Sequence, residues 1–169
     1  MKAELLISDL EAGAAMIPSL LVGITQEEAQ IRPTPENWSV LDVMCHFLDE
    51  ERRDFRVRLE YTLFHPQDMW PMIDPPGWVT THRYAEQNLQ DVVIQFLFER
   101  RNSVEWLRGL ESPNWDAPYT APWGQITAGD LLCSWVAHDN LHIRQLVELR
   151  RARIEQIAAP YGIGYAGDW

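Results

Sequence analysis

Lysine is almost absent from this sequence. Lys2 is the only lysine among 169 residues, and 14 Lys+Arg stand against 25 Asp+Glu, for a formal net charge of −11. Nucleic-acid surfaces need a basic stripe, and anionic membranes attract basic clusters. The composition therefore argues against nucleic acid and membrane as partners. With lysine so scarce, Schiff-base and P-loop chemistry are not expected either.

Cysteine and long apolar runs are also scarce. The two cysteines, Cys45 and Cys133, are too few for a disulfide scaffold and are interpreted as small buried hydrophobes. No window reaches ~18 uninterrupted apolar residues, and acidic side chains interrupt the first 25 residues, so neither a membrane span nor a signal peptide is expected. We expect a cytoplasmic protein with a single domain over residues 1–169.

Prolines divide the chain into windows of helical length. Outside the N-terminal stretch they cluster at 33–35, 66–76 and 113–122. Apolar periodicity and two capping-box signatures predict helices over about 39–64, 84–111 and 127–155, and the N-terminal stretch adds a fourth helix. These elements predict an all-α fold, a four-helix bundle with up-and-down topology and a long loop between helices 2 and 3.

Five histidines are the most informative polar residues. His138 and His142 have H-x-x-x-H spacing in the last predicted helix. Their Cβ atoms therefore lie ~5–6 Å apart on one face, and both imidazoles can reach one divalent ion. The spacing alone fits a hydrogen-bonded buried pair at least as well. His46, in the second predicted helix, is the best candidate for a third ligand, whereas His65 and His82 flank the long loop and are expected to be solvated.

The pattern around His46 leaves its direction open. His46 shares a stripe with Asp42, Asp49 and Glu50, as a solvent-exposed histidine would. Apolar residues nevertheless extend almost around this half of the helix, as they would under a covering segment. Glu50 is a candidate general base or ligand, or simply a solvated carboxylate. Gln145 is a candidate for orienting a metal-bound water, or for filling a polar gap.

Tryptophan is abundant, with eight residues. Trp70 and Trp78 lie in the long loop, and Trp123 lies before the last predicted helix. Loops of this length are usually functional or flexible. These side chains are expected either to roof a pocket or to anchor their loops.

Taken in order, the motifs resemble the DinB-like (DinB/YfiT) superfamily of metal-dependent enzymes. The residues that carry the resemblance are Trp38-Ser39, His46, the Gly124-x-x-Thr127 lead-in and His138-Asp139-x-x-His142-x-x-Gln145. The resemblance covers nearly the whole chain. It implies a four-helix bundle in which His46, His138 and His142 bind one divalent metal ion, with zinc or nickel ahead of iron and manganese.

The same resemblance implies a range of reactions. Relatives include S-transferases and isomerases that use low-molecular-weight thiols, others that resemble hydrolases, and many homodimers. Three imidazoles leave a coordination position open for water or a thiol. We therefore expect a thiol-dependent S-transferase or a hydrolase acting on a small molecule, with Glu50 and Gln145 as the nearest catalytic candidates. The alternative is a non-catalytic module with a structural ion, which a fourth protein ligand would favour.

Overall fold

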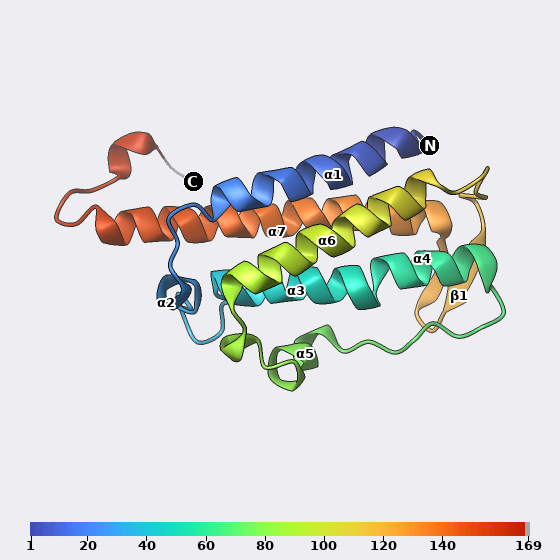
Figure 1. Cartoon of the computed structure of the whole chain (residues 1–169), viewed down its shortest axis with the longest axis horizontal. Helices are drawn as coiled ribbons and strands as arrows, with labels where there is room; N and C mark the ends of the chain where they lie inside the picture. Colours follow the sequence, from blue (N-terminus) through green and yellow to red (C-terminus); the bar gives the residue numbers. More distant parts are fainter. Residues whose placement is uncertain (168–169) are drawn as a thin grey trace.

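Four long helical segments confirm the predicted bundle. The computed structural model describes residues 1–167. Each long segment packs against two neighbours: α1 against α6 and α7, and the α3–α4 segment against the same two helices (Figure 1). No helix in the described residues is long and apolar enough to cross a membrane. The long helices are α1 (Ala3–Leu20), α3 (Val40–Arg53) with its continuation α4 (Phe55–Phe64), α6 (Leu89–Arg108) and α7 (Ala128–Ile157).

The topology of the bundle differs from the predicted up-and-down arrangement. Arg52 of α3 contacts Glu99 of α6, and Arg56 of α4 contacts Ser103, so the two segments run in the same direction. Helices α1 and α7 are also parallel, as Figure 1 shows. The physical reason is the connection between α4 and α6, which is long enough to return along the bundle and start α6 beside the beginning of α3. Bundles with such crossovers place sequential helices parallel.

The predicted capping boxes are present at both helix starts. Ser39 caps α3 with Asp42, and Thr127 caps α7 with Asp130, each through reciprocal side-chain and backbone hydrogen bonds. The second predicted helix is interrupted, however. Asp54 leaves the helical region at φ −116° and ψ −93°, and α4 begins at the next residue.

Short elements fill the connections. Two short strands directly before α7 pair antiparallel and form a hairpin. The sequence did not predict this hairpin, because two four-residue strands are too short to show a clear period. Cys133 is exposed, contrary to its interpretation as a buried residue, whereas Cys45 is buried. The short elements are α2 (Gln26–Ala29), α5 (Pro75–Thr81), the 3₁₀ turns η1 (Tyr84–Glu86) and η2 (Gly164–Ala166), and the strands β1 (Pro118–Ala121) and β2 (Gly124–Thr127).

Candidate metal centre

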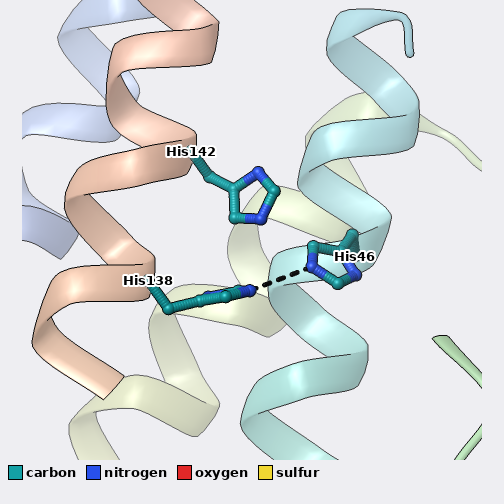
Figure 2. A group of neighbouring side chains, drawn as sticks. All are labelled: His46, His138 and His142. Atoms are coloured by element: carbon teal, nitrogen blue, oxygen red, sulfur yellow. Dashed lines mark hydrogen bonds between the residues drawn. The ribbon is translucent and has the colours of Figure 1, made fainter. Parts of the chain in front are cut away.

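Three imidazoles from two helices converge between α3 and α7. His46 extends from α3, and His138 and His142 extend from successive turns of α7, as Figure 2 shows. The Nε2 atoms of His46 and His138 lie 3.1 Å apart. One ligand atom from each of the three residues lies within 4.8 Å of the others. The structure thus brings together the three histidines that the sequence indicated.

Burial keeps these imidazoles neutral. Burial, together with the neighbouring His142, lowers the pKa of His46 to about 3. Burial and the other two histidines lower the pKa of His138 to about 3 as well. Burial also lowers the pKa of His142, against the opposing effect of a hydrogen bond to Gln145. Neutral imidazole is the form that binds metal ions, so all three residues are ready to act as ligands at neutral pH.

The nitrogens that face away from the cluster lie next to Gln145 and Glu50. His142 Nδ1 is 2.8 Å from Gln145 Oε1, an acceptor, so Nδ1 carries the proton and Nε2 keeps its lone pair. His46 Nδ1 has no hydrogen-bond partner, and its nearest carboxylate oxygen, Glu50 Oε1, is 3.6 Å away. Burial and then the charge of Asp54 raise the pKa of Glu50 to about 9, so Glu50 holds a proton at neutral pH.

The donor set fits a divalent ion. Two imidazole nitrogens that share one tetrahedral ion at ~2.0–2.1 Å are about 3.3–3.4 Å apart, close to the spacing of the His46 and His138 Nε2 atoms. A hydrogen-bonded pair of imidazoles would also bring two nitrogens together. A simple hydrogen-bonded pair does not explain why a third imidazole, that of His142, is buried beside it. It also does not explain why Gln145 fixes the His142 nitrogen that faces away from the cluster. Outer-nitrogen acceptors of this kind are typical of metal-ligating histidines.

Aromatic rings surround the imidazoles. The Trp38 ring lies 4.8 Å from that of His46 and stacks 5.9 Å from that of His142, and the Phe55 ring lies 5.1 Å from that of His138. The tryptophan beside the site is therefore Trp38. Trp70 stacks on Tyr119, Trp78 stacks on His82, and Trp123 is exposed, which favours loop anchoring for the first two.

A buried ion network next to the site was not found from the sequence. The guanidinium of Arg100 pairs with Glu51 of α3 and with Asp139 of α7, and donates to the carbonyl oxygen of Leu10 in α1. All three side chains are nearly inaccessible. Asp139 follows His138 directly, so the network holds the histidine-bearing part of α7 against three other helices. Only the position of Asp139 inside the histidine motif could have suggested it.

The two remaining histidines lie outside the cluster. His65 is half-exposed, as expected. His82 is partly exposed, with 30% of its side-chain surface accessible, and its Nδ1 also lies 2.7 Å from Asp49 Oδ2.

The fold and the site together define a class: a four-helix bundle with one long crossover, carrying three histidines on two facing helices. The sequence matches the family profile described as the DinB superfamily over residues 9–146. The chain therefore belongs to the DinB superfamily. No protein in a curated collection matched the sequence.

A solved structure shares the fold. YfiT from Bacillus subtilis, described as a probable metal-dependent hydrolase with an unusual four-helix bundle topology, superposes with a TM-score of 0.80 at 18% sequence identity. The match covers 90% of this chain and 87% of YfiT. The likeness confirms the four-helix bundle.

Proposed function

We propose that this protein is a metal-dependent enzyme whose divalent ion, zinc or nickel, is held by His46, His138 and His142. The observation that carries the proposal is the convergence of three neutral imidazoles, with one ligand atom of each within 4.8 Å of the others. A divalent ion with three protein ligands and an open position lowers the pKa of a water or thiol bound there.

The surrounding residues support this role by fixing the ligands. Gln145 accepts from His142 Nδ1, which sets the tautomer and orientation of that ring. Glu50 lies behind His46 on the side of Nδ1. We assign Gln145 as a positioning residue that acts through His142. Glu50 makes no hydrogen bond to His46 and keeps the role of a candidate for proton transfer. Trp38, Phe47 and Phe55 cover the imidazoles with apolar surface and exclude water, which strengthens electrostatic interactions at the site.

Hydrolysis is the reaction that we favour, because the structurally similar YfiT is described as a probable hydrolase. Thiol-dependent S-transfer, implied by the resemblance to the superfamily, is the alternative. Both reactions would use a small-molecule substrate and the same three histidines. The non-catalytic alternative requires a fourth protein ligand, and within residues 1–167 the cluster of possible ligands contains the three histidines alone.

The test starts from untagged protein purified without added metal. We expect about one divalent ion per chain by elemental analysis, and a loss of most of it in His142→Ala with an unchanged helical circular-dichroism spectrum. His65→Ala is the matched control and should keep the metal, because that residue lies outside the cluster. Unchanged metal content in His142→Ala would contradict the proposed site.

Cobalt(II) substitution separates the reactions. Changes in the d–d spectrum on adding a small thiol would favour S-transfer, and changes with pH or small anions alone would favour hydrolysis. Turnover of acyl or amide substrates by the metal-loaded protein should then confirm the second outcome. A d–d spectrum that no thiol, anion or pH change affects would show a saturated structural site and refute the enzymatic proposal.

A further inference from the structure

A polar cavity lies between α3, η1 and α6, away from the three-histidine cluster. Its volume is about 260 Å³, and none of the three clustered imidazoles lines it. Water in the liquid occupies about 30 Å³ per molecule, so the cavity has room for a small organic ion. Asp49, Arg52, Arg53, His82 and Tyr84 contribute most of its polar wall.

Asp49 organises this wall. Its Oδ2 accepts from the Tyr84 hydroxyl and faces His82 Nδ1, both at 2.7 Å, and its Oδ1 accepts from Arg53 Nε at 3.0 Å. Asp49 and Tyr84 are more than nine-tenths buried. Three groups thus contact the single Asp49 carboxylate, and these interactions hold the imidazole of His82 and the guanidinium of Arg53 at the cavity.

Several donors at the cavity remain unused. In the described part of the chain, the terminal nitrogens of Arg53 have no hydrogen-bond partner. His82 Nε2 has none either, but it is an acceptor in a neutral ring whose Nδ1 donates to Asp49. Arg52 donates through Nε to Glu99 and through Nη2 to Gln95, which leaves Nη1. Arg52 is paired with Glu99 and Arg53 with Asp49, and anchoring of the crossover to α3 explains Tyr84 and His82. These contacts do not explain why two arginines of a chain with a net charge of −11 both keep free guanidinium nitrogens at one cavity.

We propose that this cavity binds a small oxyanion, the carboxylate or phosphate group of a low-molecular-weight ligand, between the free guanidinium nitrogens of Arg52 and Arg53 and next to His82. Guanidinium groups match the geometry of both anions, and charge-assisted hydrogen bonds to them are among the stronger polar contacts. The oxyanion site is separate from the three-histidine cluster and does not depend on a metal there.

The test is an NMR titration of the full-length, metal-loaded protein at low and constant ionic strength. Sodium acetate and sodium phosphate are the probes, sodium chloride is the reference, and the His82 imidazole signal, identified by its loss in His82→Gln, is the readout. We expect a saturable shift with at least one oxyanion and none with chloride. Saturation by phosphate alone would identify a phosphate site, and saturation by acetate would identify a carboxylate site.

Variants locate the binding. Arg53→Gln should weaken the apparent affinity at least tenfold, and Arg52→Gln provides a second test if the first variant alters the circular-dichroism spectrum. Arg101 is an exposed arginine on α6, so Arg101→Gln is the matched control. This variant should change the apparent anion affinity less than twofold. Anion binding at the three-histidine cluster would not depend on Arg53. A shift that never saturates, or an equal loss in Arg101→Gln, would overturn the proposal.

Discussion

Replacing Arg100 by methionine should destabilise the protein strongly. Methionine keeps most of the volume but removes the only guanidinium between Glu51 and Asp139. Glu51 is 0% exposed and Asp139 is 3% exposed, so neither carboxylate can turn to solvent without opening the core. The variant also removes the donor to the Leu10 carbonyl.

The magnitude follows from the cost of an uncompensated buried charge. Breaking a buried ion pair by removing one partner costs about 3–5 kcal/mol. At roughly 0.05–0.15 kcal/mol per residue, a chain of this length has about 8–25 kcal/mol of total stability, so the variant should fold with a much reduced margin. With a urea m-value of about 2–3 kcal/mol/M, the midpoint should fall by about 1–2.5 M.

The assay is equilibrium urea unfolding followed by circular dichroism. Arg101→Met is the control: Arg101 is exposed and lies 4.0 Å from an exposed Glu105, so its loss should cost within about 0.5 kcal/mol. Burial raises the pKa of Asp139 even with Arg100 present. Without Arg100 that pKa rises further, and a raised carboxyl pKa makes stability fall as pH rises. The difference in free energy of unfolding between the unaltered protein and Arg100→Met should therefore become smaller as the pH falls from 7.5 to 5.5.

The triple variant Arg100→Met, Glu51→Leu, Asp139→Leu distinguishes charge balance from the loss of arginine itself. Replacement of a whole buried ion network by apolar residues is often neutral or stabilising. The triple variant should thus recover most of the stability that the single variant loses. A cost below 1 kcal/mol for Arg100→Met, or a triple variant as unstable as the single one, would refute the reasoning.

Three further outcomes are expected. Gln145→Ala should weaken metal binding about 10–100-fold in competition with a chelator while leaving the helical spectrum unchanged, because it removes the acceptor for His142 Nδ1; equal affinity would contradict the positioning role. Metal-free protein should lose stability as pH falls from about 6.5 towards 3, because His46 and His138 bind protons in this range only after unfolding. With two protons taken up, the free energy of unfolding should fall by up to about 2.7 kcal/mol per pH unit. A thermal-unfolding midpoint that does not change with pH would contradict this prediction. Cys45 should resist a thiol reagent that labels the exposed Cys133 at neutral pH. The reason is that Cys45 is buried, and burial and the charges of Asp49 and Asp42 raise its pKa to about 12. Equal labelling rates of the two cysteines would contradict this prediction.

Local signals in the sequence were sufficient for the helices but not for their arrangement. Ser39 and Thr127 are both caps, because a capping box depends only on residues three apart. The direction of α6 depends on where the crossover ends, which no local pattern encodes. The break at Asp54 was also missed, because Asp54 lies inside a continuous helical pattern and differs only in its backbone angles.

The clustering of the three histidines was predictable by spacing and resemblance, while the burial of His46 was left open. The polar stripe with Asp42 and Asp49 fitted either solvent or a covering segment, and both carboxylates are buried under other parts of the chain. Arg32 covers Asp42, and the His82–Tyr84 segment covers Asp49. A helical wheel shows only the residues of one helix, so it cannot show a stripe covered by polar partners.

Helix α3 shows why the site needs this covering. Every residue from Val40 to Glu51 is buried, and its polar side chains face different partners around the helix: Arg32, the imidazoles of α7, the His82–Tyr84 segment and Arg100. Burying polar groups is costly unless each is paired, so a rotation of α3 would break several of these contacts together. The orientation of His46 is therefore fixed by contacts all around its helix. Precise placement of a ligand on a rigid element held on several sides is what a three-histidine site requires.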